Sequence, residues 1–271
     1  MTIVIGMLRD NGLVMGADTE ETAEDFKRSV TKLPSYTNSH GHALIIGGAG
    51  CECQIQTVTQ ALQDDFSDVE SAVEIAKLLE KFRNTIKTHY KEHVLCWPSA
   101  IEREENDFSL LLGAVFRLGP KKVKSEHALC KLWISQRGMI RDARAHEAIG
   151  TGANYARTLL DDYLGMYSIQ KAVMIAVYIL HRVKRDTPYC GKESQLWSTK
   201  GSSVRPVFYE AVQQAEELFK RFDHFSVKNF FTTVSLEGNT QSDRFNEKDI
   251  ASNFRVLRKQ FRQLSESMAK Y

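Results

Sequence analysis

Residues 1–18 read MTIVIGMLRDNGLVMGAD, and the rest of the chain is organised around this stretch. Two short apolar runs flank the Asn11-Gly12 pair, which is a strong local signal for a β-hairpin. One end of that hairpin is the chain terminus, and the other end delivers a carboxylate, Asp18. The sequence therefore predicts a hairpin whose two outer ends both carry reactive groups.

The second residue is a threonine, which can act as a nucleophile once it becomes the first residue. Removal of Met1, which is usual before a small residue, would place a hydroxyl and an α-amine together on Thr2. An α-amine has a reference pKa of about 7.7–8.0, so part of it is free base near neutral pH. It can then accept the hydroxyl proton without the help of a histidine. A threonine also follows methionine in many proteins by chance, so the remaining motifs must decide.

Composition limits the classes of protein that fit. The 271 residues are 42% apolar with a formal net charge of +2, which fits one large domain or two small ones. The near-neutral balance indicates no nucleic-acid surface. The longest apolar run, residues 172–180, covers about half of a membrane span, and no secretory leader precedes Thr2.

The five cysteines lack the spacing of a metal site. Reduced thiols are typical of a cytoplasmic protein. We therefore expect a cytoplasmic protein with no metal and no cofactor, and with neither a membrane nor a nucleic acid as a partner.

Hydrophobic periodicity predicts an α+β protein. Residues 2–46 are predicted to form four strands of one antiparallel sheet, namely the two hairpin strands and the runs 30–36 and 42–46. The acidic stretch 19–25 is predicted to be a loop. The later elements that we expect are helices at 51–65, 68–92, 154–164, 168–184, 207–221 and from 249, strands at 108–116, 129–135, 138–141, 195–199 and 230–235, and a loop at 97–106. Strands followed by two helices, twice over, predict a four-layer αββα sandwich with two antiparallel sheets between helix layers.

A run of small residues, Gly47-Gly48-Ala49-Gly50, joins a predicted strand to a predicted helix. Small residues there allow backbone N–H groups to face outward at the positive end of a helix, where they can hold an oxyanion. A close-packed corner between strand and helix would need the same residues. The pattern alone leaves both interpretations open.

Six short motifs, in this order and at nearly the same spacing, resemble those of proteasome-type β subunits of the N-terminal nucleophile hydrolases. The matching pieces are Thr2-Ile3-Val4, Gly16-Ala17-Asp18, Val30-Thr31-Lys32, Gly47-Gly48-Ala49, Ile149-Gly150-Thr151-Gly152 with Tyr155-Ala156, and Arg185-Asp186 before Tyr189 and Gly191. They span residues 2–200, about three quarters of the chain. The absence of a propeptide before Thr2 resembles the simple bacterial members, the HslV peptidase and the Anbu proteins. We therefore expect a divergent bacterial member and assign it to neither branch.

The resemblance implies a threonine peptidase with Thr2 as nucleophile and its own amine as base. Lys32 would lie beside the hydroxyl, where a buried ammonium lowers the hydroxyl pKa, and Asp18 would pair with Lys32. The segment between Asp18 and Lys32 is about two residues shorter than in the family. Lys27 is therefore an alternative, although only Lys32 lies inside the strand-like run.

The remaining catalytic roles also come from the resemblance. The N–H of Gly47 would donate to the oxyanion. Asp186 and Thr151 would orient the terminal amine by hydrogen bonds, with Thr151 standing where the family usually has serine. Each of these residues could also serve the fold alone, so we assign them jointly with Thr2.

The same matching implies a specificity pocket that is mostly apolar and of small to medium size. Its expected lining residues are Glu21, Thr22, Val30, Pro34, Ile45, Ala49 and Cys53. We therefore expect medium apolar side chains to be preferred at the cleavage position, with Glu21 able to admit a basic group.

Family members act in enclosed chambers, so the resemblance implies identical subunits in a ring or stacked assembly that cleave polypeptides. Whether an ATPase unfoldase feeds the chamber is left open. We expect a catalytic domain over 1–202 and a C-terminal extension, 203–271, packed on the core or on a neighbouring subunit.

Two alternatives belong to other classes of function. One is a catalytically silent subunit of a larger shell, against which the presence of both Asp18 and Lys32 argues. The other is an N-terminal nucleophile amidase acting on a small molecule, whose site the segments 97–106 and 203–225 could close.

Overall fold

The computed structural model of the chain divides into two compact units, Met1–Val207 and Phe208–Tyr271. The residues that it describes are 2–9, 12–23, 26–118, 128–143, 145–163, 168–235, 255–256 and 259–264. Only the backbone is described for residues 22–23, 26–27, 200 and 225–235.

The first sheet is built on the hairpin at the start of the chain. Strand β1 (Ile3–Arg9) pairs antiparallel with β2 (Gly12–Asp18), which confirms the predicted hairpin. The sheet has five strands in the order β10 (His146–Gly150), β1, β2, β11 (Ser194–Lys200) and β12 (Ser203–Pro206). Since β12 pairs with β11, the first unit extends past residue 202. The packing of the C-terminal extension stays a prediction.

The second sheet is also antiparallel and five-stranded. Its order is β5 (Ser35–Thr37), β6 (Ala43–Gly50), β7 (Phe108–Arg117), β8 (Ala128–Gln136) and β9 (Met139–Asp142). The prediction that the strands of residues 2–46 share one antiparallel sheet is therefore wrong. The segment that follows β2 carries the chain from the first sheet to the second, so β1 and β2 lie in one and β5 and β6 in the other.

That connecting segment contains a two-stranded sheet which the sequence analysis placed in a loop. Strand β3 (Glu20–Ala23) pairs with β4 (Phe26–Ser29). Backbone pairing forms this small sheet without an alternating apolar face, so no period marks it in the sequence. The strand predicted over 30–36 is observed only as β5, because only residues 35–37 pair with β6.

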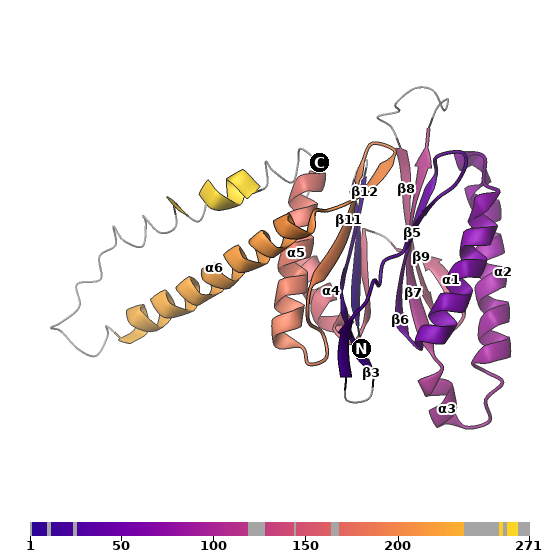
Figure 1. Cartoon of the computed structure of the whole chain (residues 1–271), viewed down its shortest axis with the longest axis horizontal. Coiled ribbons are helices and arrows are strands. Elements are labelled where there is room, and N and C mark those ends of the chain that lie inside the picture. Colours follow the sequence, from indigo (N-terminus) through magenta and orange to yellow (C-terminus); the bar gives the residue numbers. More distant parts are fainter. Residues whose placement is uncertain are drawn as a thin grey trace. The chain divides into compact units, whose positions relative to one another are not determined.

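Helices cover the outer faces of both sheets in the first unit (Figure 1). Helices α1 (Glu52–Ser67) and α2 (Ile75–His93), joined through the short 3₁₀ helix η1 (Ala72–Glu74), lie on the second sheet. Helices α4 (Ala153–Asp162) and α5 (Ile169–Asp186) lie on the first. The predicted four-layer αββα sandwich is therefore confirmed.

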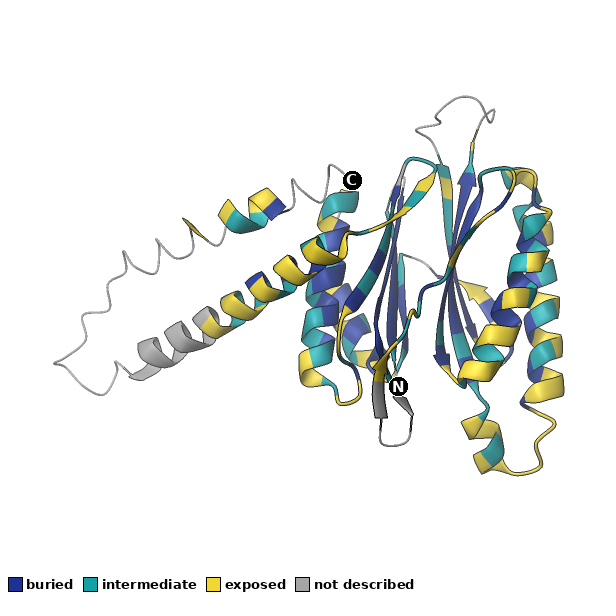
Figure 2. Ribbon diagram, viewed as in Figure 1, coloured by how far each residue is buried: buried dark blue, intermediate teal, exposed yellow. Residues whose placement is uncertain are grey.

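The strands of the second sheet contribute to two separate cores because their side chains alternate between faces. In β6, Leu44 and Ile46 pack among the side chains of α1 and α2. Ala43 and Ile45 pack between the two sheets. Buried residues accordingly fill both the space between the sheets and the inner faces of the helices (Figure 2).

The segment 97–106 also differs from the predicted loop, because it contains helix α3 (Ala100–Glu105). A capping box starts this helix. The Glu102 N–H donates to Ser99 Oγ at 3.1 Å, and the Ser99 N–H donates to the Glu102 carboxylate at 3.2 Å. A serine followed three residues later by a glutamate is readable from sequence, so this helix could have been found.

The second unit contains α6 (Tyr209–Ser235), which includes the residues 230–235 that were predicted as a strand. Aromatic and β-branched residues favour strands only where cross-strand partners exist, and here the preceding helix simply continues. Residues 255–256 and 259–264 are helical as well. Within the described part of the chain, no helix combines the length and apolar character that crossing a membrane requires.

Candidate active site

A buried ion pair between Lys32 and Asp18 forms the centre of the site. Lys32 Nζ lies 3.0 Å from Asp18 Oδ1, and the two side chains are 7% and 0% exposed. Lys32 also donates to the carbonyl oxygen of Glu20. Asp18 accepts the Ile3 N–H at 3.0 Å and the Gly191 N–H at 3.1 Å. These bonds compensate the two buried charges and hold the ammonium in one place.

The chain path explains which lysine reaches the site. Asp18 is the last residue of β2, and the Val30 N–H donates to the carbonyl oxygen of Thr19 at 2.9 Å. This bond returns the chain from the β3–β4 sheet to the end of β2, two residues before Lys32. Lys27 lies within β4, where only its backbone is described. The structure therefore brings Lys32 to Asp18.

Thr2 is held at the start of β1 by the end of β10. The Thr151 N–H donates to the Thr2 carbonyl oxygen at 2.9 Å, and Ile3 pairs with Gly150. Gly150 has a φ of +99°, and a Cβ there would lie 2.0 Å from the Thr2 oxygen. Only glycine fits this backbone and this approach. Thr151 also lines the adjoining pocket, and its predicted hydrogen bond to the terminal amine stays a prediction.

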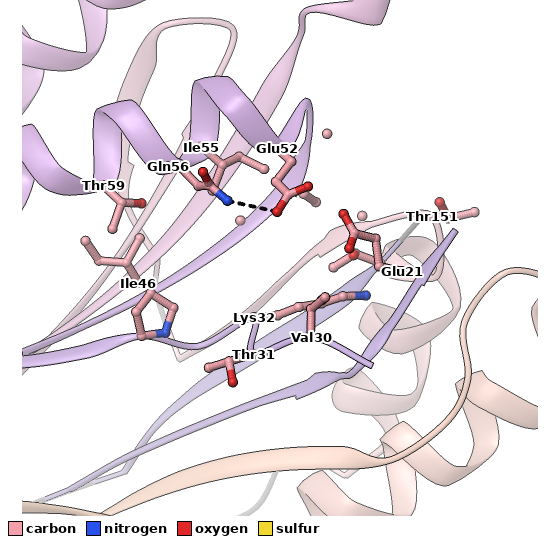
Figure 3. Close-up of a pocket in the computed structure, with 16 residues that line it drawn as sticks. Glu21, Val30, Thr31, Lys32, Ile46, Glu52, Ile55, Gln56, Thr59 and Thr151 are labelled. Carbon is pink, nitrogen blue, oxygen red and sulfur yellow. Dashed lines mark hydrogen bonds between the residues drawn. The ribbon is translucent and has the colours of Figure 1, made fainter. Parts of the chain in front are cut away.

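A pocket of about 370 Å³ opens beside Thr2, and Lys32 and Thr151 also line it. This volume is within the range of small-ligand sites. Figure 3 shows the Lys32 side chain running past Val30 toward the end of the pocket where Glu21 and Thr151 lie. The pocket wall continues along the end of β6 and the first turns of α1. The nucleophile candidate and the buried ammonium therefore face one common space.

The backbone donor that faces this pocket is Gly48, whereas Gly47 was predicted. The Ile46 N–H donates to Pro34 at 3.0 Å, on the β5 side of β6, and Gly47 is paired with Leu111 of β7. Alternate residues of a strand point their backbone groups to the same side. The Gly48 N–H therefore points to the β5 side, beyond the start of β5, and Gly48 lines the pocket while Gly47 does not.

Gly47 has a packing role instead. It is buried between the sheets, and a Cβ there would lie 2.5 Å from a methyl carbon of Val4 and 2.9 Å from one of Leu33. For this residue the close-packed corner is the interpretation that the structure supports. A glycine run by itself cannot distinguish the two roles, because both need a residue without a side chain.

Two carboxylates and one guanidinium gather at the pocket. Arg28 Nε lies 2.5 Å from Glu21, and Arg28 Nη2 lies 3.4 Å from Glu52. Gln56 donates to the other Glu52 oxygen at 2.8 Å. The hydrogen bond from Arg28 lowers the pKa of Glu21, and the hydrogen bond with Glu21 raises the pKa of Glu52. The raised pKa of Glu52 reflects the second carboxylate beside it, and the two carboxylates share the single guanidinium of Arg28.

Only some of the residues that were predicted to line the specificity pocket do so. The ones that line the pocket are Glu21, Val30, Pro34 and Ala49. Ile45 is fully buried between the sheets, and its neighbour Ile46 lines the pocket, because successive side chains of β6 face opposite ways. Cys53 does not line the pocket, and the side chain of Thr22 is outside the described residues.

Helix α1 supplies lining residues that the sequence analysis missed. They are Glu52, Ile55, Gln56 and Thr59. Their spacing of three and four residues is that of one helix face. This period was visible after the glycine run, but the sequence could not show that the face meets a pocket, since it also looks like an ordinary solvated stripe.

Asp186 lies among cations rather than on the pocket. Its carboxylate accepts the Tyr155 hydroxyl at 2.9 Å and contacts Arg185 Nε at 2.6 Å and Arg182 Nε at 3.4 Å. It is not one of the pocket-lining residues. In the structure this carboxylate therefore ties the end of α5 to α4, which differs from the role predicted for it.

These contacts make Asp186 a source of acid sensitivity. The Arg185 hydrogen bond is the main cause that lowers the pKa of Asp186 from 3.8 to about 2. A depressed folded-state pKa stabilises the protein above the unfolded-state value, and this contribution is lost as the pH falls through the folded-state value. We expect the urea-unfolding free energy to fall less between about pH 4 and about pH 2 in Asp186→Asn than in the unmodified chain. Asp64→Asn, an exposed change on α1, is the control, and an equal fall in Asp186→Asn would contradict the assignment.

Comparison with solved structures identifies the fold. No protein-family model and no curated protein matches the sequence. Solved structures do match, and the three described here are each covered over their full length. Anbu, the ancestral beta-subunit, from Yersinia bercovieri is 15% identical over 89% of this chain, with a TM-score of 0.62. The chain has the fold of the Anbu proteins.

Two further structures with this fold are similar. A Gly-1 mutant of Anbu from Hyphomicrobium sp. strain MC1 is 12% identical over 90% of the chain, with a TM-score of 0.64. The third, described as the helical assembly of the Anbu complex from Pseudomonas aeruginosa, is 17% identical over 90%, with a TM-score of 0.63. At these identities the likeness establishes the Anbu fold alone.

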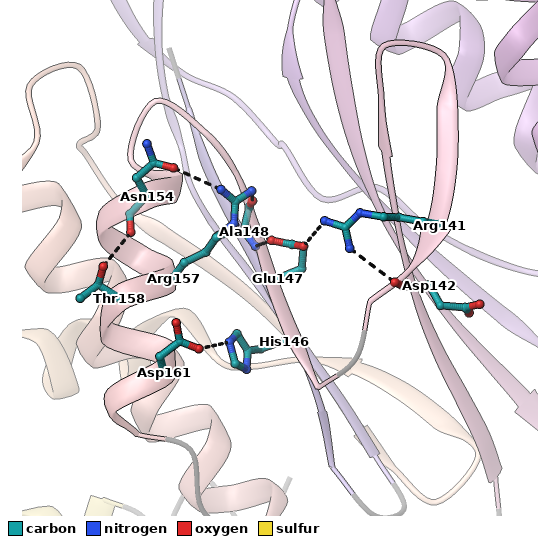
Figure 4. Close-up of polar contacts among 9 residues, drawn as sticks. All are labelled: Arg141, Asp142, His146, Glu147, Ala148, Asn154, Arg157, Thr158 and Asp161. Atoms are coloured by element: carbon teal, nitrogen blue, oxygen red, sulfur yellow. Dashed lines mark hydrogen bonds and ion pairs between the residues drawn. The ribbon is translucent and has the colours of Figure 1, made fainter.

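A charged network secures the strand that holds Thr2 in this Anbu fold. Glu147 of β10 accepts Arg157 Nε of α4 at 2.6 Å and Arg141 Nη2 of β9 at 2.8 Å (Figure 4). Arg157 also donates to the carbonyl oxygen of Ala148. Burial opposes ionisation of Glu147, but these hydrogen bonds lower its pKa on balance. The network fixes β10, which ends at Gly150, between α4 and the second sheet.

Proposed function

We propose that the chain is a proteasome-type threonine peptidase in which Thr2, exposed by removal of Met1, attacks peptide bonds. The observation that carries the proposal is the buried Lys32–Asp18 pair on a pocket that Thr2 also lines. Burial of an ammonium costs on the order of several kcal/mol of desolvation free energy before its partner compensates. A lysine that served the fold alone would therefore be more stable in solvent.

The chemistry follows from the groups that meet at the pocket. The Thr2 hydroxyl attacks the carbonyl carbon of the scissile bond, and the Thr2 amine takes the hydroxyl proton. The Lys32 ammonium favours the alkoxide electrostatically. The carbonyl oxygen becomes an oxyanion that the Gly48 N–H can stabilise. The amine then returns its proton to the leaving nitrogen, and water hydrolyses the Thr2 ester to release the acid.

We further propose that identical subunits assemble to enclose this site, in the cytoplasm. The description of one similar structure as a helical assembly supports self-association. All five cysteines are free, as is usual in a reducing compartment. Polypeptides are the proposed substrate, and an ATPase unfoldase is the kind of partner that would deliver folded ones.

Intact mass and active-site labelling test the proposal. We expect the purified chain to lack Met1, and an electrophilic peptide boronate or epoxyketone to modify Thr2. Labelling and peptide hydrolysis should be lost in Thr2→Ala and kept in Thr57→Ala, an exposed change on α1. A chain that retains Met1 and is never labelled would instead be the silent shell subunit. Labelling with hydrolysis of small amides but of no peptide would favour the amidase.

A further inference from the structure

The pocket beside Thr2 contains polar groups that the proposed cleavage chemistry does not use. Thr59 lines the pocket and is only 8% exposed. Its Oγ1 is buried and has no hydrogen-bond partner among the described residues. A buried hydroxyl without a partner costs free energy, and such groups are rare in native proteins. A ligand that reaches Thr59 would supply the missing hydrogen bond.

The charges around the pocket favour a cationic ligand. Glu21 and Glu52 share one guanidinium, that of Arg28. The ammonium of Lys32 is already held by Asp18 and by a backbone carbonyl. The pocket therefore offers acceptors with excess negative charge, and a second cation would relieve the repulsion between its two carboxylates.

The walls between these polar groups are apolar. Val30, Pro34, Ile46 and Ile55 line the same pocket. Lysine and arginine bury their methylene stems along apolar surface and present their charge at the tip. A side chain of this kind matches both the walls and the acceptors, whereas a medium apolar side chain would leave the Thr59 hydroxyl without a partner.

We propose that α1 makes this pocket select a lysine or arginine side chain at the cleavage position, with Glu52 and Thr59 as the specificity-determining residues. The proposal rests on the proposed peptidase function. The sequence led us to expect a preference for medium apolar side chains, with Glu21 able to admit a basic group. The proposal makes the basic side chain the preferred one, because the two residues from α1 were absent from that set.

Binding can be measured without turnover. In the Thr2→Ala chain, we expect calorimetry to show that a tripeptide ending in argininamide binds at least about tenfold more tightly than its leucinamide counterpart, since hydrogen bonds to charged groups are the strong ones. Glu52→Gln should remove most of that difference, and Thr59→Val should weaken argininamide binding about threefold to tenfold, the range of one lost hydrogen bond. Neither change should alter leucinamide binding.

Asp64→Asn is the matched control, because it removes an exposed carboxylate from α1 away from the pocket. It should leave both affinities unchanged. Equal binding of the two peptides, or an arginine preference that survives both Glu52→Gln and Thr59→Val, would overturn the proposal.

Hydrolysis assays on the unmodified chain separate this inference from the peptidase itself. Turnover that is faster after leucine than after arginine would overturn the selectivity and leave the peptidase standing. An arginine preference in calorimetry with no labelling of Thr2 would overturn the peptidase and leave the pocket chemistry standing.

Discussion

Replacement of Lys32 by methionine is expected to lower peptide hydrolysis by about 100- to 1000-fold, the scale of losing one preorganised electrostatic group. It should also destabilise the fold by about 3–5 kcal/mol, because the Asp18 carboxylate would stay buried without its cation. Asp18 is fully buried, so solvent cannot replace the ammonium. Initial rates on a fluorogenic peptide and urea unfolding measure the two effects.

A double variant separates catalysis from stability at this pair. Lys32→Met combined with Asp18→Asn leaves no net charge buried, so we expect it to recover part of the lost stability and none of the activity. Lys87→Met, an exposed change on α2, should affect neither. If the double variant regained hydrolysis, Lys32 would act only on the fold and its proposed part in the chemistry would be wrong.

Gly150→Ala is expected to have the second-largest effect. Its φ of +99° suits only glycine, and the new Cβ would lie 2.0 Å from the Thr2 carbonyl oxygen, so Thr2 must move. Misplacing a reacting group by about 1 Å costs on the order of 100-fold in rate. Backbone strain adds a destabilisation of about 1–3 kcal/mol.

Gly41→Ala is the control, because it strains the backbone in the same way but does not displace a neighbouring residue. Gly41 also has a positive φ, of +80°, but a Cβ there would be no closer than 3.7 Å to Arg117. We expect a similar loss of stability with hydrolysis unchanged. If Gly150→Ala lost only what Gly41→Ala loses, the contact between Gly150 and Thr2 would not position the nucleophile.

The fold was predictable where a hydrophobic period marks an element. The apolar runs around Gly12 predicted a strand pair, and the apolar stripe over 168–184 predicted a helix, and both exist. Prediction failed for β3, which forms by backbone pairing, and for residues 230–235, whose strand-like composition lies inside a helix. Strand β3 pairs with the neighbouring β4 without an alternating apolar face, and residues 230–235 continue the helix that precedes them, so residue composition alone gave the wrong state in both places.

The site was predictable in its residue types and less so in its geometry. Thr2, Asp18 and Lys32 were named from short motifs, and the structure brings the last two into contact. The motifs missed which glycine turns its N–H to the pocket, because a shift of one residue along a strand reverses every direction. They also missed α1, whose polar face looks the same whether it borders solvent or a pocket.

Sequence by itself predicted the two hairpin strands and most of the helices, and it named Thr2, Lys32 and Asp18 as candidate site residues. Only the tertiary structure decided that Gly48 rather than Gly47 faces the pocket, that Asp186 lies among arginines, and that Glu52 and Thr59 reach the same space as Thr2. The physical reason is that periodicity is a local property of the chain, whereas a pocket is formed by segments that meet only after the two sheets have packed.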